Sequence, residues 1–347
     1  MSLGEFLRAI PKVELHCHLL GTVRYETFLD LATRRNAPIA RSEIDAFYER
    51  GEKPVGAIRV LRALDAHLLA TPDDLYRITR EYLEDARAHG VLYSEFFWNP
   101  TGTARVSQIP YEKALDGIVA AMRDAARDLG ILSRLIPSID REAEPEAAVE
   151  MVEWVIRHRR PEVIGIGMDY TETGRPPELF WKAYRLAKQA GLKTTAHAGE
   201  FGMKWTNVET AVELLGVDRV DHGYTVIDNP EFAQRCAERR ILFTVVPTNT
   251  YYLRSLPRER WALDHPIRQM PKLGLSIHPN TDDPTLHKVT PTGAWHMMMK
   301  DFGFGLDDLK GFMLNGLDGA WIEDEVRERW KRDWGKQFDE LRGQLTG

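Results

Sequence analysis

The sequence predicts a TIM barrel, in which eight parallel strands close into a ring and helices cover the outside. Eight short runs are mostly apolar at every position, as expected for parallel strands that are buried on both faces. Amphipathic helical stretches alternate with these runs, and eight such units are the number that closes this barrel. The 347 residues are 43% hydrophobic and contain no Gly/Ser/Pro-rich linker, which favours one domain over residues 1–347.

The expected elements follow one another in a regular order. The expected strands are residues 12–18, 91–99, 132–140, 162–170, 192–199, 219–226, 242–249 and 273–282. Helical patterns lie between them, most clearly at 111–130, 180–191 and 230–240. Extra helices are expected as an insertion after the first strand (24–90), on the face where such barrels place their sites, and at the C-terminus (306–345). An open doubly wound sheet is the alternative architecture.

Composition and charge argue against several classes of function. The net charge is −6, and no basic stripe is present that would hold a nucleic-acid backbone. No run approaches the roughly 18 apolar residues of a membrane span, and the N-terminal segment is too short and too acidic for a signal peptide. Cys17 and Cys236 cannot form a disulfide framework, which suits a reducing compartment. We therefore expect a cytoplasmic protein that binds neither nucleic acid nor membranes.

Chemically reactive side chains occur where four of the expected strands end. In a barrel these ends surround one mouth, where TIM barrels place their sites. Each motif alone has a simpler explanation, namely a packed histidine, a turn or a surface carboxylate. Their joint occurrence at four strand ends favours a single site. The motifs are His16-Cys17-His18 on the first strand, His197-Ala198-Gly199-Glu200 on the fifth, Asp221-His222-Gly223 on the sixth and Asp282-Asp283 on the eighth.

Three imidazoles and one carboxylate from these motifs form a metal-binding set. Side chains alternate along a strand, so the two imidazoles of the first motif face one way and Cys17 faces the other. Nitrogen and carboxylate oxygen donors suit one Zn²⁺ ion, although Fe²⁺, Co²⁺ and Mn²⁺ fit the same donors. One position left for water would make the site catalytic, because the metal lowers the pKa of that water to about 7. The expected ligands are His16, His18, His197 and Asp282.

The motifs PKVELHCHLLGTVR, TAHAGE, DHGY and NTDDP resemble those of the adenosine deaminase family, which belongs to the amidohydrolase superfamily. They occur in the family's order and together span residues 11–284. The resemblance implies a TIM barrel with one zinc ion that hydrolyses the 6-amino group of a purine to the 6-oxo product and ammonia. It also implies that Glu200 donates a proton to purine N1, that His222 orients or helps deprotonate the attacking water, and that Asp283 bonds the purine near N7.

Other metal-dependent hydrolases fit the sequence less well. Deaminases with an H-x-E motif also carry P-C-x-x-C, and this chain has no C-x-x-C. Dinuclear amidohydrolases often carry a modified lysine at the end of the fourth strand, where this chain has no lysine in residues 168–172. A single metal ion is therefore expected.

Two departures from the family pattern concern the substrate. Nucleoside deaminases of the family commonly carry an acidic residue where Leu20 stands, and leucine cannot accept a hydrogen bond from the ribose. The segment DYTETGRPPELF (169–180) resembles the free-adenine branch, so Glu172 is expected either to contact the N3/N9 edge of a base or to cap the next helix. Gly167 and Asp169 are further expected substrate contacts. The expected substrate is a 6-aminopurine, adenine or adenosine, and these features weaken the case for adenosine.

Other functions remain open on the sequence alone. Aromatic residues at strand ends either pack or line an apolar pocket for an N6-substituted adenine; they are Phe97, Trp98, Tyr251 and Tyr252. Another mononuclear amidohydrolase would keep the barrel and the metal but act on a different amide, ester or ring. A non-catalytic metal-binding barrel is the remaining alternative, although it would have no use for an acid such as Glu200. The sequence does not predict the oligomeric state.

Overall fold

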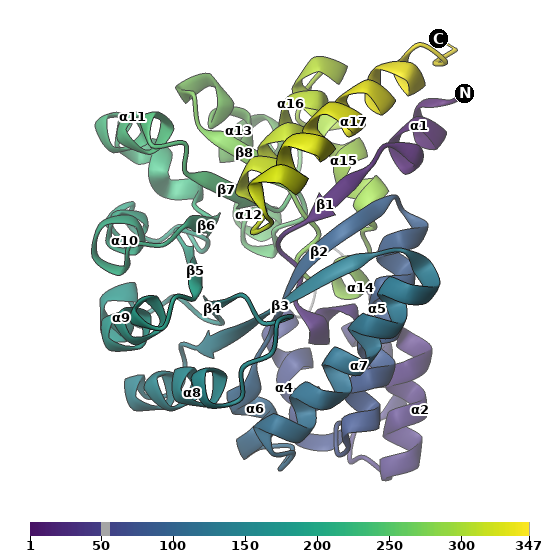
Figure 1. Ribbon diagram of the computed structural model, residues 1–347, viewed down its shortest axis with the longest axis vertical. Coiled ribbons are helices and arrows are strands. Elements are labelled where there is room, and N and C mark those ends of the chain that lie inside the picture. The colour runs from purple at the N-terminus through teal and green to yellow at the C-terminus, as the bar shows by residue number, and fades with distance from the viewer. Residues whose placement is uncertain (50–55, 347) are drawn as a thin grey trace.

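The structure is a computed structural model, and it describes residues 1–49 and 56–346. Eight parallel strands pair in sequence order and curl into a barrel, with helices outside them (Figure 1). The predicted TIM-barrel fold is therefore confirmed. The strands are β1 (Lys12–Glu14), β2 (Val91–Trp98), β3 (Leu132–Asp140), β4 (Gly165–Asp169), β5 (Lys193–Ala198), β6 (Arg219–His222), β7 (Leu242–Val245) and β8 (Ser276–Pro279).

Helices precede, separate and follow these strands. Helix α1 (Leu3–Ala9) comes before β1, and the stretch between β1 and β2 contains α2 (Tyr25–Arg35), α3 (Arg41–Phe47), α4 (Ala57–His67) and α5 (Pro72–Ala88). The helices between β2 and β8 are α6 (Pro100–Arg105), α7 (Tyr111–Leu129), α8 (Pro145–Arg157), α9 (Trp181–Gln189), α10 (Thr206–Glu209), α11 (Pro230–Glu238), α12 (Thr250–Ser255) and α13 (Trp261–Asp264). After β8 come α14 (Pro284–His287), α15 (Pro291–Lys300), α16 (Leu306–Gly319) and α17 (Asp324–Arg342). Within the described residues, none of the helices has the length and apolar character needed to span a bilayer.

Local sequence signals set several helix boundaries. Thr71 caps the start of α5 by accepting a hydrogen bond from the backbone N–H of Asp74, whose side chain bonds back to the cap, and Pro72 occupies the first helical position. Helix α7 ends at Gly130, whose φ of 67° lies in the left-handed region that glycine adopts without strain. These helices pack on strands that are buried along almost their whole length, as in β2.

Seven of the eight strands are shorter than the apolar pattern predicted, and only β3 has the predicted bounds. β1 ends at Glu14, four residues before the predicted end, so His16 and His18 lie just beyond the strand. β6 stops at His222, because Gly223, with a φ of 70°, turns the chain into a 3₁₀ helix at Tyr224–Asp228. β7 stops four residues before the predicted end at 249, and β8 begins and ends inside the predicted range 273–282. The residues that follow each of these strands remain buried, so the apolar run continues after strand pairing has ended.

The ring closes between the first and last strands through a short seam. Asp282 donates its backbone N–H to the carbonyl of His16 at 3.0 Å, and its own carbonyl accepts the N–H of His18 at 2.8 Å. Deeper in the barrel a side chain replaces backbone pairing, since Oδ1 of Asn280 accepts the N–H of Leu15 at 2.9 Å. The seam therefore holds three of the expected metal ligands in a fixed register.

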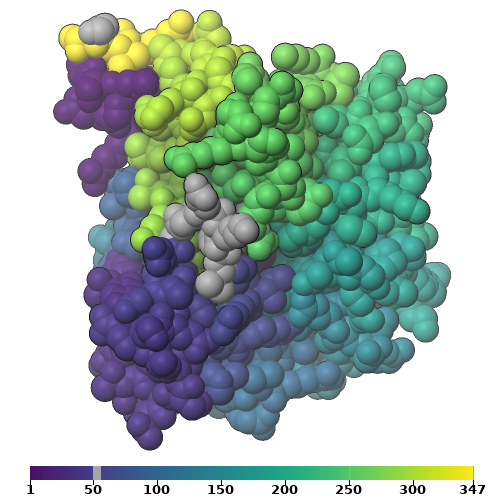
Figure 2. Space-filling model, turned by 180° about the vertical axis from the view of Figure 1, so that it is seen from behind, coloured from purple at the N-terminus to yellow at the C-terminus, as the bar shows by residue number. Residues whose placement is uncertain are grey.

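The segments that follow β1 and β7 meet over the carboxyl ends of the strands. Figure 2 views the molecule from behind and shows the violet to blue helices that follow β1 below the green segment that follows β7. Ala57, Ile58 and Leu61 of α4 line the same cavity as Arg254 of α12. The mouth of the barrel is thus enclosed by residues from distant parts of the chain.

Candidate metal centre and active site

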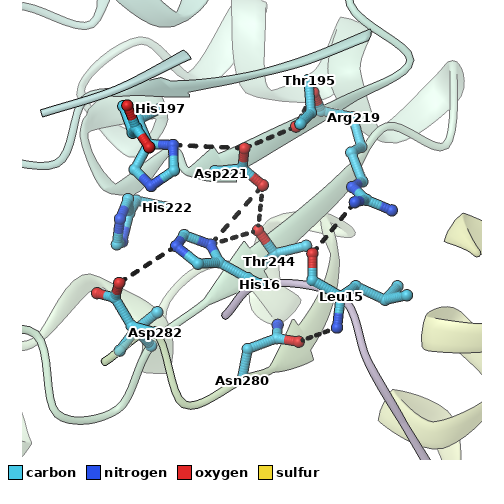
Figure 3. Close-up of polar contacts among 12 residues, drawn as sticks. Leu15, His16, Thr195, His197, Arg219, Asp221, His222, Thr244, Asn280 and Asp282 are labelled. Carbon is cyan, nitrogen blue, oxygen red and sulfur yellow. Dashed lines mark hydrogen bonds and ion pairs between the residues drawn. The ribbon is translucent and has the colours of Figure 1, made fainter. Parts of the chain in front are cut away.

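The ends of β1, β5 and β8 bring the four expected metal ligands together. Nε2 of His18 lies 3.2 Å from Nε2 of His197 and 3.2 Å from Oδ1 of Asp282. Nε2 of His16 lies 3.6 Å from the same carboxylate oxygen (Figure 3). All four side chains are buried. Donors from three separate segments of the sequence therefore converge on one point.

The chemistry of this cluster fits a divalent metal ion. Donor atoms of His16, His18 and His197 lie within 4.8 Å of one another, and so do those of His16, His222 and Asp282. Nε2 of His16 and Nε2 of His222 are buried without a hydrogen-bond partner among the described residues, a cost that a bound cation at His16 would relieve. Burial disfavours the charged form of Asp282, but contacts with His16 and His18 hold its pKa well below the usual value. Imidazole nitrogen and carboxylate oxygen are donors that Zn²⁺ and similar ions prefer.

Asp169 lies next to His18, on the side of the ring that faces away from the cluster. It ends β4, and its Oδ2 lies 3.4 Å from Nδ1 of His18, the ring nitrogen that faces away from the cluster. A carboxylate in this place fixes the orientation and tautomer of a metal-binding histidine. Asp169 also lines the cavity, where the sequence predicted a substrate contact, although its carboxylate is turned toward His18.

Three cavity-lining residues at or just beyond strand ends adopt the left-handed backbone conformation, with φ of 64° for His222, 65° for Asp282 and 66° for Tyr170. Residues other than glycine seldom adopt it, and its cost of about 1–3 kcal/mol is typical of functional sites. In a regular strand Asp221 and His222 would face opposite sides. The turn at His222 instead lets both side chains point into the barrel.

His222 presents a ring nitrogen without a hydrogen to the cavity. The hydroxyl of Tyr224 donates to the carbonyl of Val246 at 3.1 Å and accepts its N–H at 2.9 Å. That hydroxyl lies 3.3 Å from Nδ1 of His222 and has no second hydrogen, so it accepts from Nδ1–H. Nε2 of His222 then carries a lone pair 3.6 Å from Oε2 of Glu200. Burial lowers the pKa of His222 well below its usual value, which keeps the ring neutral and able to accept a proton.

Glu200 faces the same cavity from the loop after β5. Its Oε1 accepts a hydrogen bond from Nδ2 of Asn249 at 3.1 Å. Burial, followed by the negative charges of Asp282 and Glu172, raises the pKa of Glu200 well above its usual value. A bound dication would lower this pKa, whereas burial and the charge of Glu172 raise it. Such a carboxyl group can donate a proton near neutral pH.

Glu172 holds the loop that carries Glu200. Its carboxylate accepts the backbone N–H groups of Gly199 and Glu200 at 2.9 and 3.1 Å, and the side-chain amide of Asn207 at 2.7 Å. With both oxygens used in this way, Glu172 is buried and is not among the cavity-lining residues. The structure thus places Glu172 behind the site, where it neither contacts the cavity nor caps the next helix.

Leu20 and Gly167 also lie outside the cavity lining. Leu20 belongs to a buried 3₁₀ helix, Leu19–Thr22, and packs into the hydrophobic core. Gly167 lies inside β4, where an added Cβ would be 2.9 Å from the ring of Phe97. Both are close to the site in sequence, but the backbone directs them into the packed wall. The structure therefore does not support direct substrate contacts for them.

Of the two alternatives for the aromatic residues at strand ends, packing or lining an apolar pocket, the structure shows packing. Phe97 is fully buried, with its ring centroid 5.0 Å from that of His18 and 5.3 Å from that of His16, and Trp98 stacks on Tyr111. The four aromatic residues predicted from strand ends are all absent from the cavity lining. Tyr170 and Phe201 line it instead, because the loops after β4 and β5 turn over the mouth.

Asp283 lies at the start of α14, beside the metal-binding cluster. It is buried and lines the cavity, and so does His287 one turn later, whose Nε2 is 3.9 Å from Oδ2 of Asp283. Gly21 packs closely against Asp283, and a Cβ added at Gly21 would lie 1.8 Å from Oδ1 of Asp283. The cavity between these residues and Glu200 has a volume of about 120 Å³.

Comparisons with known proteins agree with this geometry. The sequence model of the family described as Adenosine deaminase matches residues 11–332. An adenine deaminase from Vibrio parahaemolyticus is 31% identical, over 95% of this chain and 96% of that protein. A crystal structure of an amidohydrolase from Burkholderia ambifaria with bound zinc is 65% identical, with a TM-score of 0.97 over 98% of this chain and 93% of that one.

A second solved structure, an adenine deaminase from Arthrobacter aurescens, is 26% identical, with a TM-score of 0.86 over 96% of this chain and 100% of that one. The similarity therefore extends over nearly the whole chain, and the cluster of histidine and aspartate donors has the chemistry of a divalent-metal site. The chain belongs to the adenosine deaminase family and is a hydrolase that acts on carbon–nitrogen bonds in cyclic amidines.

Proposed function

We propose that this protein is a zinc-dependent deaminase of 6-aminopurines, with free adenine as the first candidate substrate. The observation that carries the proposal is the placement of Glu200 and Asp283 around one cavity, beside the cluster of metal-binding donors. An acid and a hydrogen-bonding carboxylate beside a metal centre match what hydrolysis at C6 of a purine requires. The products would be hypoxanthine and ammonia.

One zinc ion would be held by His16, His18, His197 and Asp282. When bound, zinc lowers the pKa of water to near neutrality and so supplies a nucleophile. His222, neutral and with a lone pair on Nε2, would orient the attacking water and take its proton. These assignments are supported by the hydrogen bonds that fix the His222 tautomer and by the bound zinc in the Burkholderia ambifaria relative.

Glu200 would donate its proton to N1 of the ring as the water oxygen bonds to C6, because this addition otherwise leaves negative charge on the ring. The C6–N bond then breaks, and the amino group leaves as ammonia after it has taken up a proton. His222, having taken the first proton of the water, would supply the proton that the amino group needs. The carboxylate of Glu200, which lies 3.6 Å from His222, would take the remaining hydroxyl proton as the C6 carbonyl forms, so both groups return to their starting states. Asp283 would form a hydrogen bond near N7 and so place the ring against Glu200.

The choice of a free base over a nucleoside is supported by Leu20. It is buried in the core and offers no acceptor for a ribose hydroxyl. A site without that acceptor gains little binding free energy from the sugar of a nucleoside. The relatives from Vibrio parahaemolyticus and Arthrobacter aurescens, which are adenine deaminases by name, point in the same direction.

An N6-substituted adenine is a second candidate. Part of the cavity wall is apolar, since Ala57, Ile58, Leu61 and Phe201 are among the residues that line it. Such a wall would accept an alkyl group on the departing nitrogen, and the product would be the same oxopurine with an alkylamine in place of ammonia.

A substrate panel tests the proposal. Purified protein would be assayed with adenine, adenosine and N6-methyladenine, after removal of metal and again after addition of zinc, by following the ultraviolet change to the 6-oxopurine. We expect turnover that requires metal, with the highest kcat/KM for adenine. Preference for N6-methyladenine would favour the second candidate. Absence of turnover with every 6-aminopurine in protein that contains stoichiometric zinc would contradict both.

The close contact between Gly21 and Asp283 gives a further prediction. A Gly21→Ala substitution is expected to lower kcat/KM by about 100-fold, because a Cβ at 1.8 Å from Oδ1 of Asp283 forces the carboxylate out of place. Steady-state kinetics and thermal unfolding would measure the effect. Gly311→Ala on α16, where an added Cβ meets no atom within 4 Å, is the matched control and should keep full activity. Equal activity in the two variants would show that Asp283 need not be held at this position.

A further inference from the structure

Asp221 is a buried carboxylate at the centre of the barrel. It lies on β6, is fully inaccessible to solvent, and points toward His197 on the adjacent β5, Thr244 on the adjacent β7 and His16 in the segment after β1 (Figure 3). Among the described residues, its ion-pair partners are imidazoles alone. Arg219, two residues earlier, is engaged elsewhere with Glu95 and with the carbonyl of Leu15.

One oxygen of Asp221 determines the tautomer of His16 through Thr244. The hydroxyl of Thr244 donates to Oδ1 of Asp221 at 2.7 Å and lies 3.0 Å from Nδ1 of His16. A hydroxyl has one hydrogen, so the oxygen of Thr244 must accept a hydrogen bond from Nδ1–H of His16. Nε2 of His16 then has no hydrogen, and its lone pair faces Asp282 and the metal-binding cluster.

The other oxygen of Asp221 lies beside a second histidine. Oδ2 accepts the hydroxyl of Thr195 at 2.8 Å and is 3.5 Å from Nδ1 of His197. Nε2 of His197 faces away from Asp221 and toward His18 in the cluster. The same carboxylate therefore lies behind two of the expected metal ligands, which come from different strands.

The complete burial of Asp221 also needs an explanation. A buried carboxylate is costly unless it is paired with a cation or well hydrogen-bonded. The two threonine hydroxyls supply hydrogen bonds, and the imidazoles of His16 and His197 connect the carboxylate to the place where a cation would sit. A dication at the cluster would be balanced in part by this carboxylate, although Asp221 does not touch it.

We propose that Asp221 is a positioning residue that orients His16 and His197 together for metal binding. The proposal rests on the proposed metal site but not on the identity of the purine. Carboxylates behind metal-binding histidines fix the ring orientation and raise ligand basicity, and their loss usually weakens metal binding by about 10–100-fold. Here one residue would serve two ligands, so its removal should affect both.

An Asp221→Asn variant tests this role directly. The amide has the same size, but its NH₂ group can only donate to a threonine oxygen or a ring nitrogen, so it cannot hold both histidines in the required tautomer. We expect zinc affinity to fall by about 10–100-fold in competition with a chromophoric chelator. In metal-free protein, ¹⁵N-imidazole NMR should show the Nδ1–H tautomer of His16 and of His197 in the parent and its loss in at least one of the two rings in the variant.

A second variant keeps the test decisive if Asp221→Asn does not fold. Thr244→Val removes only the link to His16, so it should lower zinc affinity by less than Asp221→Asn and change the tautomer of His16 alone. Asp228→Asn, on the surface after β6, is the matched control and should bind zinc as the parent does. Unchanged zinc affinity and an unchanged tautomer in folded Asp221→Asn or Thr244→Val would overturn the proposal. These readouts involve no substrate, so a failed purine assay would leave the result intact.

Discussion

Replacing Glu200 by glutamine is expected to lower kcat by about 10²–10⁴-fold while zinc content and thermal stability stay close to those of the parent protein. Glutamine fills the same space and can still contact Asn249, but its amide has no acidic proton for N1 of the ring. Because the acid acts in the chemical step, kcat should fall more than KM rises. Steady-state kinetics, metal analysis and thermal unfolding of the same preparation would separate these effects.

The control for this variant is Glu213→Gln. Glu213 is exposed on the surface and pairs with Arg239 at 2.9 Å, so the same chemical change there should leave kcat unaltered. If Glu200→Gln turned over adenine at a rate within a few-fold of the control, the proton would have to come from another group. The proposed role of Glu200 would then be abandoned.

A His197→Ala substitution is expected to abolish stable metal binding and, with it, nearly all turnover. The change removes one of the three imidazoles of the cluster and leaves Nε2 of His18 without its neighbour at 3.2 Å. Loss of a direct ligand should weaken binding by more than the 10–100-fold that is typical of an outer partner. Metal content after dialysis, measured per chain, checks the prediction without any substrate.

His296→Ala is the matched control, because His296 lies on the surface of α15, away from the cavity. It should retain the metal content of the parent protein. A His197→Ala protein that kept one zinc ion per chain through the same dialysis would refute the assignment of His197 as a ligand. Excess zinc in the assay would further separate weak binding from loss of chemistry.

The strand order and the convergence of the reactive residues could be predicted because both depend on short-range patterns. An H-x-H pair on a strand places two imidazoles on one side, and the carboxyl ends of parallel strands meet at one rim. The structure accordingly brings His16, His18, His197 and Asp282 together. The lengths of β1, β6, β7 and β8 were overestimated, because buried segments continue the apolar pattern beyond the last paired residue.

Sequence patterns could not predict the roles of Asp221 and Glu172 in supporting the site. Period-two alternation places Asp221 and His222 on opposite faces, and only the positive φ of His222 lets both point inward. Glu172 lies next to the site in sequence, yet its carboxylate binds the backbone of the loop after β5. Such roles depend on the direction of a side chain in a loop, which neighbouring residues do not determine.

The contact between the segments after β1 and β8 links metal binding to the stability of the closed barrel. His16 and His18 belong to the first segment and Asp282 to the last, and two backbone hydrogen bonds already connect them. An ion bound by these three side chains would hold the first and last segments of the barrel together. The two segments could then separate only after the ion had been released. Chelation should accordingly loosen this contact before any other part of the wall, and saturation with metal should raise the temperature at which the whole fold is lost.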